Sequence, residues 1–324
     1  MNTMGPLRPL LRTAKLAGIR RRAERLARTR CPDEASPSSP PPGFIVACGR
    51  SGTTILGRLF ATHPEIAYLR EPYHYWAQID RRCDVTNLHY HVRGLWFMDA
   101  EHRSDHAQLV FNRLVMGERA RARKPMVVEK TPHNVARIGF LEVLAPGARY
   151  VHIVRNGIDV CRSIEQLATE QPYRMAFKPR YNQWWGEDCA KWRALSEEGP
   201  ARGYFPTEAD LLTTNAQRGA YEWLTSLGEA DRWRGALGDR LLEIRYPDLT
   251  SDPHASLLRL CDHFGVAAPG AWLDRALPLV GPERVRKRGP IALPPEMARA
   301  FNALQERYEF EGRAEPAIRP ETAK

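Results

Sequence analysis

Short, mainly apolar segments alternate with helix-spaced apolar residues along most of the chain. Five such segments predict buried strands: Phe44–Cys48, Ile66–Leu69, Met126–Val128, Tyr150–Val154 and Leu241–Ile244. Between them apolar residues recur at intervals of three and four, which is typical of helices that bury one face. Strands that alternate with helices predict an α/β fold, in which a parallel sheet is flanked by helices on both faces.

The first predicted strand leads into a small polar loop. Gly49–Thr54 separates the strand Phe44–Cys48 from a helix that begins near Ile55 and ends at His63-Pro64. In such a turn the backbone N–H groups point inward and the helix dipole adds partial positive charge, while Arg50 adds a full charge. We therefore predict a P-loop-like site for a phosphate or sulfate group.

The loop differs from the Walker A motif of ATP-binding and GTP-binding proteins. That motif ends in Gly-Lys-Ser/Thr, whereas here Ser51-Gly52 is followed directly by Thr53-Thr54. A kinase without that lysine lacks its main contact to the outer phosphates. An ordinary strand-helix turn with an incidental arginine is the alternative interpretation.

A second strand-helix unit carries a matching cation and hydroxyl. Arg155 follows the predicted strand Tyr150–Val154, and Ser163 lies about two turns into the helix behind it. Open α/β sheets bind ligands at the carboxyl ends of their strands, so both side chains could meet one anion. Taken alone, the pair also fits an arginine at a helix start with an ordinary helical serine.

Two further polar residues stand at or near predicted strand ends. Glu71 follows the strand Ile66–Leu69 and precedes the aromatic run Tyr73–Trp76, which makes it a candidate general base, with His74 as the next candidate. A surface glutamate before a turn proline is the ordinary alternative. Lys130 follows the strand Met126–Val128, and we expect a helix from Pro132 to about Leu144.

Charge is distributed unevenly along the chain. The net charge is +10, but residues 1–30 hold nine Arg or Lys against one Glu, so that segment carries +8 and the rest only +2. This distribution argues against a nucleic-acid-binding surface over the whole domain. The six cysteines are far apart and include no Cys-x-x-Cys pair, which favours reduced thiols.

The N-terminal 42 residues are expected to lie outside the main domain. Residues 1–30 predict a basic helix with Leu16, Ile19, Ala23 and Leu26 on one face, and residues 31–42 form a Pro/Ser-rich linker. The helix could lie on an anionic membrane surface, or it could be a solvated basic tail. We expect residues 43–324 to fold without residues 1–42.

No apolar stretch approaches the ~18 residues of a membrane span, and no signal peptide is evident. Together with the Arg- and Ala-rich composition, these features suggest a bacterial cytoplasmic enzyme, with peripheral contact at the inner membrane face left open. His102 and His106 stand four apart beside Glu101, but no third ligand has suitable spacing, so we expect no metal site.

Several motifs together resemble the sulfotransferases that use 3′-phosphoadenosine 5′-phosphosulfate (PAPS). Gly49–Thr54, with Glu71-Pro72 downstream, is similar to their 5′-phosphosulfate loop, and Arg155–Ser163 is similar to their 3′-phosphate motif. Lys130 and the segment Arg245–Leu249 also match family landmarks. The resemblance covers roughly residues 43–290 and is greatest to the carbohydrate and tyrosylprotein branches.

The resemblance implies the sulfotransferase fold and a donor site for PAPS, without a metal. Arg50 and the loop would hold the 5′-phosphate and the transferring group, and Arg155 and Ser163 would hold the 3′-phosphate. Tyr246 would flank the nucleotide. Arg288 aligns only loosely with a cofactor-binding residue. The chain departs from the family at Asn156-Gly157, where Asp-Pro is common, which removes a rigid turn.

The resemblance also implies the chemistry. Glu71 would take the proton of the acceptor hydroxyl, and Lys130, with Arg50, would neutralise negative charge as the sulfuryl group moves. The family favours a small-molecule acceptor, either a sugar or a glycolipid. Two other functions stay open: a small-molecule kinase with an atypical phosphate loop, and a nucleotide-binding module that has lost turnover.

Overall fold

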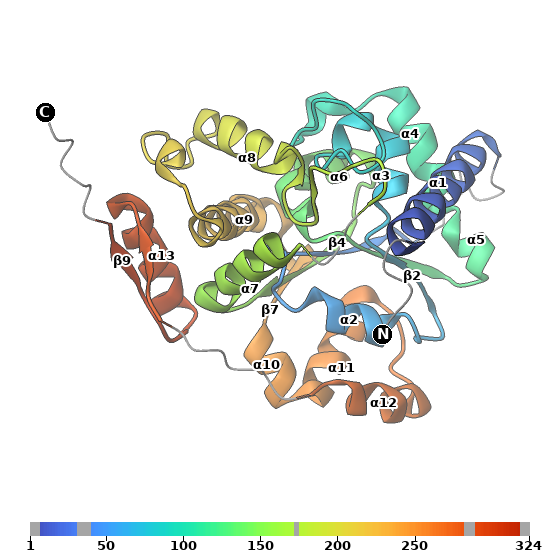
Figure 1. Cartoon of the computed structure of the whole chain (residues 1–324). Coiled ribbons are helices and arrows are strands. Elements are labelled where there is room, and N and C mark those ends of the chain that lie inside the picture. Colours follow the sequence, from blue (N-terminus) through green and yellow to red (C-terminus); the bar gives the residue numbers. More distant parts are fainter. Residues whose placement is uncertain (1–6, 31–39, 172–174, 282–288, 318–324) are drawn as a thin grey trace, which may run out of the picture.

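A five-stranded parallel sheet forms the centre of the protein in the computed structural model, which describes residues 7–30, 40–171, 175–281 and 289–317 (Figure 1). The strand order is β2-β3-β1-β4-β7. The strands are β1 (Gly43–Val46), β2 (Ile66–Arg70), β3 (Met126–Lys130), β4 (Arg149–Val154) and β7 (Leu241–Arg245). All five predicted strands are therefore confirmed, with boundaries shifted by one or two residues.

Successive residues of the central strand enter different hydrophobic clusters. Phe44 and Val46 of β1 pack on one side of the sheet, and Ile45 and Ala47 pack on the other. This alternation is what a strand covered on both faces produces. The predicted α/β fold, with helices on both faces, is confirmed (Figure 1).

The helices divide between the two faces. Residues of α2, α11 and α12 cover the side of Ile45, whereas α3, α4, α6 and α9 cover the side of Phe44. Among the described residues, the helices are α1 (Leu7–Arg28), α2 (Thr53–Phe60), α3 (Tyr73–Ile79), α4 (Asp105–Phe111), α5 (Glu118–Ala122), α6 (Ile138–Leu144), α7 (Gly157–Glu170), α8 (Ala190–Ala201), α9 (Asn215–Leu237), α10 (Tyr246–Ser251), α11 (Pro253–Phe264), α12 (Gly270–Ala276) and α13 (Pro295–Arg307).

The chain leaves the neighbouring strands β1 and β4 toward opposite faces. Helix α2, which follows β1, packs with α11 and α12, whereas α7, which follows β4, packs against α9. Such a divergence of connections opens a crevice at the carboxyl ends of the two strands, where open α/β sheets bind their ligands.

The helix expected from Pro132 to Leu144 is divided in two. Pro132–Arg137 forms a 3₁₀ segment, and α6 begins only at Ile138. Arg137 is fully buried, and its guanidinium donates to the carbonyls of Leu95 at 2.7 Å and Cys83 at 3.2 Å. These bonds to a distant segment hold the backbone at the break, and they are not visible in the local sequence.

Helix α1 packs on the rest of the protein (Figure 1). Ala23 is fully buried, the Arg20 guanidinium donates to the carbonyl of His89 at 3.0 Å, and Arg113 donates to the carbonyl of Ala27 at 2.9 Å. Leu26 also packs against the core. Ala23 and Leu26, which form the C-terminal end of the predicted apolar face, are thus turned toward the protein and cannot contact a membrane.

The segment 171–235 contains more than the predicted helices. Besides α8 and α9 it includes a small hairpin of β5 (Tyr181–Asn182) and β6 (Gly186–Glu187). Another two-stranded sheet, β8 (Ile291–Leu293) with β9 (Ala314–Pro316), lies beside α13. Within the described part of the chain, no helix combines the length and the hydropathy that a bilayer span requires.

Candidate functional site

The loop after β1 has a backbone shaped for an anion. Arg50 and Gly52 both have positive φ, 71° and 96°. A Cβ atom on Gly52 would lie 2.2 Å from the ring of Tyr246, so only glycine fits this turn. Thr53 and Thr54 begin α2, whose first N–H groups have no partners within the helix and carry the positive end of its dipole.

A tryptophan from a distant segment packs against the start of this loop. A Cβ atom on Gly49 would lie 2.3 Å from the ring of Trp184. The indole of Trp184 donates to Glu222 at 3.0 Å, and the buried Lys191 donates to the same carboxylate at 2.8 Å. The Lys191 ammonium also lies 4.0 Å from the Trp184 ring centroid. The contact fixes Gly49, and the segment 171–235 thereby supports the loop.

Arg155 and Ser163 lie beside this loop, as their positions in the second strand-helix unit suggested. The Arg50 guanidinium donates to the Ser163 hydroxyl at 2.9 Å, which joins the two units directly. The Arg155 guanidinium lies 4.7 Å from the centroid of the Tyr246 ring and 3.7 Å from Asp159. Tyr246 thus separates Arg155 from Gly52 and helps to position both.

A cavity of about 440 Å³ lies where the two units meet. It is lined by Arg50, Gly52, Thr53, Thr54, Ile55, Arg58, Arg155, Ser163, Tyr246, Leu279 and Gly281. Among these lining residues there are three arginines and no carboxylate. A cavity with this lining favours an anion that carries more than one negative charge.

Arg58 was missed by the sequence analysis. It lies on α2, four residues after Thr54, so that both side chains occupy the same side of the helix and line the cavity. The spacing from Thr54 was a usable signal, although arginines at that spacing are common on exposed helices. Trp184 was also missed, because nothing in its local sequence connects it to Gly49.

Ser51 is not among the described residues that line this cavity. Ser51 is buried, and its hydroxyl has no hydrogen-bond partner among the described residues. Because a buried hydroxyl normally has a partner, this group is available to a ligand at the loop. Arg288 lies outside the described residues.

A helix cap by the Asn156 side chain takes the place of the rigid turn that an Asp-Pro pair would supply. Its side chain accepts hydrogen bonds from the N–H groups of Ile158 and Asp159, which caps α7. Its amide donates to the carbonyl of Glu311 at 2.7 Å, and Gln305 donates to its oxygen at 3.3 Å. The capped turn keeps Arg155 at the strand end without proline.

Glu71 and Lys130 form an ion pair at the ends of β2 and β3. Strand pairing aligns Arg70 with Lys130, and the Glu71 N–H donates to the Lys130 carbonyl at 2.7 Å. The Lys130 ammonium, which is only 1% exposed, contacts the Glu71 carboxylate, which is 37% exposed. Lys130 also aligns with Ile45 of β1, so the pair lies on the β3 side of the anion loop.

The Glu71 backbone is held in an unusual conformation. Its φ is 47°, in the left-handed region that non-glycine residues rarely occupy. The Lys130 carbonyl and the N–H of Tyr73, which donates to Glu71 at 2.7 Å, stabilise this turn. Backbone strain of this kind concentrates at functional sites, where it directs a side chain.

His74 faces away from the Lys130 pair. Its ring contacts Tyr75 and His89, and burial together with the nearby charges of His89 and Arg22 lowers its pKa to about 4. Arg22 belongs to α1, so His74 lies beneath that helix. Glu71 therefore contacts Lys130 at the end of β2, whereas the neighbours of His74 are Tyr75 and His89.

A second carboxylate lies beneath this pair. Glu129 is fully buried beside Lys130 and accepts hydrogen bonds from Thr131, from Trp76 at 3.0 Å and from Asn134 at 3.2 Å. Burial raises the pKa of Glu129 to about 7, although the three donors oppose the shift. The carboxyl is enclosed by protein, so we assign it no contact with substrate.

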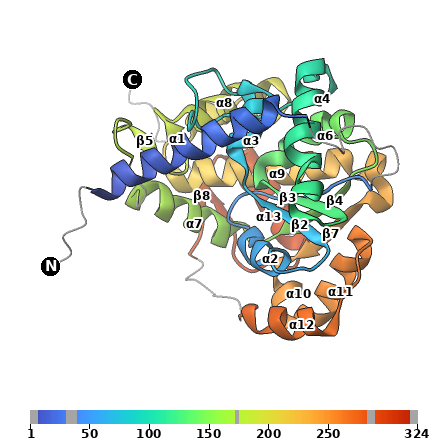
Figure 2. The ribbon, with the colours of Figure 1, turned by 90° about the vertical axis from the view of Figure 1, so that its right-hand side faces the viewer.

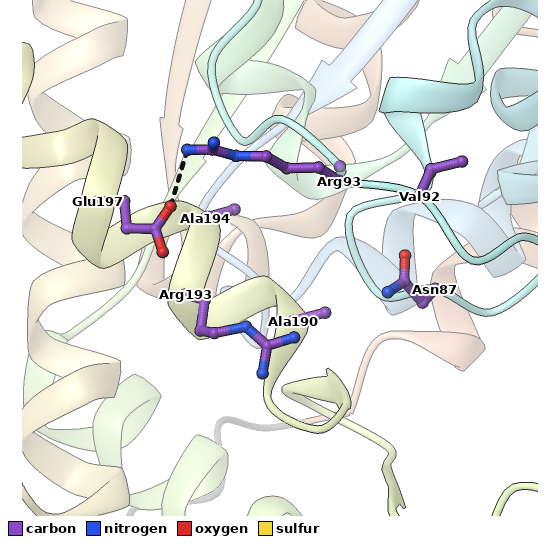
Figure 3. A pocket seen from close by; sticks show the side chains of 8 residues that line it. Asn87, Val92, Arg93, Ala190, Arg193, Ala194 and Glu197 are labelled. Atoms are coloured by element: carbon purple, nitrogen blue, oxygen red, sulfur yellow. Dashed lines mark hydrogen bonds and ion pairs between the residues drawn. The ribbon is translucent and has the colours of Figure 1, made fainter.

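A smaller cavity of about 280 Å³ lies between the loop 87–94 and α8 (Figure 3). Arg93 crosses it and donates to Glu197 of α8 at 2.9 Å. Among the described residues, this cavity shares no lining residue with the arginine-lined one, and none of its lining residues is a candidate site residue from the sequence.

The residues considered for a metal make other contacts. His102 Nδ1 accepts from the N–H of Asp99 at 3.1 Å, and His106 lies 3.3 Å from the carbonyl of Gln78. Within the described ranges, no three His, Cys, Asp or Glu side chains gather into a metal-binding group.

Comparison with known proteins identifies the family. A model described as "Sulfotransferase family" matches residues 41–208, which include the anion loop, Glu71, Lys130, Arg155 and Ser163. The chain belongs to the sulfotransferase family.

Individual relatives are more distant. Human carbohydrate sulfotransferase 5 is 39% identical over 66 residues, which is 18% of this chain and 16% of that protein. The sulfotransferase domain of the Synechococcus PCC 7002 olefin synthase superposes with a TM-score of 0.51 at 20% identity and covers 87% of this chain and 99% of that domain. The sulfotransferase domain of the curacin biosynthetic pathway gives 0.49 at 17% identity, with 85% and 100% covered. The likeness to the olefin synthase domain concerns the fold alone.

Proposed function

We propose that this sulfotransferase takes its sulfuryl group from PAPS and binds the nucleotide in the arginine-lined cavity. The observation that carries the proposal is the junction of the two strand-helix units, where Arg50 bonds to Ser163 and Arg155 lies against Tyr246. PAPS carries phosphate groups at both ends of its ribose, and a cavity with cations from two strand ends fits such a ligand.

Each side chain has a distinct role in this proposal. The loop 50–54 binds the 5′-phosphate and the transferring group, since the helix dipole, Arg50 and the Ser51 hydroxyl meet there. Arg155 and Ser163 bind the 3′-phosphate, and Tyr246 contacts the nucleotide. Arg58 adds a third guanidinium at the rim of the same cavity.

The acceptor side of the reaction belongs to Glu71 and Lys130. Lys130 contacts Oε1 of Glu71, and we assign removal of the acceptor proton to Oε2. The acceptor oxygen forms a bond to sulfur, the bond from sulfur to the phosphate oxygen breaks, and the proton moves to Glu71. Lys130 stabilises the charge that grows on the departing phosphate oxygen.

The nucleotide assignment is tested by calorimetry with two ligands. Arg155→Ala should weaken binding of 3′-phosphoadenosine 5′-phosphate by about 2–5 kcal/mol, because the variant leaves a phosphate without its cation. Adenosine 5′-phosphosulfate lacks the 3′-phosphate, so it should bind poorly and lose little more. Arg149→Ala, at the other end of β4, is the control and should bind like the parent protein. Equal losses for both ligands would refute the assignment.

We propose a sugar or glycolipid hydroxyl as acceptor. The short match to human carbohydrate sulfotransferase 5 supports a carbohydrate, although this chain spans only 16% of that protein. Mass spectrometry of candidate acceptors incubated with PAPS tests the proposal, since transfer adds one sulfate. Magnesium-dependent ATP turnover would instead indicate the kinase, and nucleotide binding without any modified acceptor would indicate the binding module.

A further inference from the structure

The outward side of α1 is strongly basic. Its exposed cationic side chains are Arg8, Lys15, Arg21, Arg22, Arg25 and Arg28, which we call the basic stripe. Glu24, the acidic residue of this helix, is half-buried and lies 3.6 Å from Arg20. The helix has 22 residues, so the stripe extends about 30 Å along its axis.

An exposed apolar group lies at the N-terminal end of this stripe. Leu10 is 47% exposed, Leu11 64% and Phe177 86%, and we call these three residues the apolar cap. The Ala176 N–H donates to the carbonyl of Pro9 at 3.5 Å, and the Thr13 hydroxyl donates to the carbonyl of Ala176 at 3.2 Å. These bonds hold Phe177 beside the first turns of α1.

The conformation of Phe177 adds to this observation. Its φ is 65°, in the left-handed region, and yet its ring is the most exposed of the large apolar side chains described. Ala176 and Phe177 are the corner residues of a tight turn that the bridge between Met175 and Lys178 closes, and this turn holds the phenyl ring in solvent. Glycine or asparagine is the usual residue where a turn requires a positive φ, so an exposed phenylalanine at this position is unusual.

The remainder of α1 is firmly attached to the protein. The buried Ala23 and the bonds of Arg20 and Arg113 fix its inward side, and Figure 2 shows the helix running along the outside of the molecule with its N-terminal end near β5. The basic stripe is therefore an ordered surface of the folded protein, with a fixed direction relative to Phe177.

We propose that the basic stripe and the apolar cap together dock the protein on an anionic lipid bilayer. The cations contact lipid phosphates and carboxylates, while Leu10, Leu11 and Phe177 enter the boundary between headgroups and acyl chains. Basic residues beside leucines and an aromatic ring are the composition of helices that lie in a membrane interface. This docking does not depend on the proposed sulfotransferase donor or acceptor.

Nucleic acid fits the same surface less well. A duplex would neutralise the basic stripe, but its phosphate backbone offers no apolar layer for two leucines. A lipid surface accommodates both the charge and the apolar cap. Phe177 should contribute to the affinity for a bilayer but not to the affinity for a duplex. Its contribution can be measured separately from that of charge.

The charge contribution is tested with the full chain and two triple variants. Lys15→Glu/Arg21→Glu/Arg25→Glu should weaken cosedimentation with phosphatidylcholine vesicles that contain phosphatidylserine by about 100-fold, at about fivefold for each basic residue. Arg259→Glu/Arg275→Glu/Arg299→Glu changes the net charge equally on exposed positions of α11, α12 and α13 and should bind like the parent. Added salt should weaken parent binding. Circular dichroism establishes that both variants are folded.

The apolar contribution is tested at fixed charge. Phe177→Ser should weaken vesicle binding by about tenfold or more, whereas Leu258→Ser, at an exposed leucine of α11, should not. If both triple variants lose binding equally, only net charge matters and the docking surface is refuted. Unchanged binding in Phe177→Ser, or tighter binding of the parent to duplex DNA than to vesicles, would also overturn the proposal.

Discussion

Glu71 and Arg50, the two residues of the proposed reaction that follow β2 and β1, both have positive φ. Neither is glycine, so each left-handed turn costs free energy that the surrounding hydrogen bonds must offset. At Glu71 the turn directs the carboxylate to the Lys130 ammonium rather than along the strand. This geometry gives Glu71 a role that a surface glutamate before Pro72 would not need.

The role of Glu71 is tested by Glu71→Gln. The amide keeps the size of the side chain and one acceptor oxygen, but it cannot take a proton. Turnover should fall by about 10²–10⁴-fold, the usual contribution of a positioned base. The affinity for 3′-phosphoadenosine 5′-phosphate should change little, because the carboxylate does not line the arginine-rich cavity.

The control for this substitution is Glu306→Gln, which removes an exposed carboxylate from α13. It should leave turnover and nucleotide affinity at the parent values. A purely structural Glu71 would lower the melting temperature and reduce turnover only in proportion to the unfolded protein. A Glu71→Gln protein that is folded, binds nucleotide and retains more than about a tenth of parent turnover would contradict its assignment as base.

At the residue level, the sequence predicted best the charged and hydroxyl side chains that follow the ends of strands. Arg50, Arg155 and Ser163 could be placed together because parallel strands end at one edge of a sheet. The support given by Trp184 could not be predicted, since Gly49 and Trp184 are distant in sequence and meet only through tertiary packing. The left-handed turn at Glu71 also depends on a bond to the neighbouring strand.

At the level of helices and strands, the sequence predicted those elements whose local apolar pattern agrees with their burial in the fold. β1 and β4 are short apolar runs with polar or glycine boundaries, and the structure buries both. The break at Arg137 was not predictable, because carbonyls from residues 83 and 95 satisfy its guanidinium. For α1 the pattern identified an apolar side, but it could not show whether protein or lipid covers that side.

The packing of α1 can be tested by placing one substitution on each side of the helix. Ala23→Glu puts a charge between α1 and the core, where Ala23 is fully buried, and should lower the melting temperature by more than about 5 °C. Ala14→Glu places the same residue on the exposed side and should change it little. Equal melting temperatures would indicate that α1 contributes nothing to the stability of the domain.

At the scale of the whole molecule, the strand order explains how the proposed site is divided. β1 lies between β3, which supplies Lys130, and β4, which leads to Arg155. The acceptor side and the 3′-phosphate side of the anion loop thus come from opposite neighbours of one strand. The sequence indicated a parallel sheet but not this order, because the order depends on which helices cover which face.

The buried Glu129 should make the stability of the whole protein depend on pH. Its carboxyl has a pKa of about 7 in the folded protein, above its ordinary value of 4.5, because burial disfavours the charged form. Between these values the unfolded chain holds fewer protons than the folded protein, so the free energy of unfolding should fall as pH rises. Below the lower value and above the higher one, this group adds no further pH dependence.

Glu129→Gln isolates this contribution, because its amide does not titrate. The free energy of unfolding is measured by urea denaturation for parent and variant across this pH range, and the value of the variant is subtracted from that of the parent. The difference should fall with rising pH from about 4.5 and level off above about 7. Glu101→Gln, at a carboxylate that is 71% exposed, should give a nearly flat difference. A difference that rises with pH would mean that Trp76, Asn134 and Lys130 stabilise Glu129 as a carboxylate more strongly than burial opposes it.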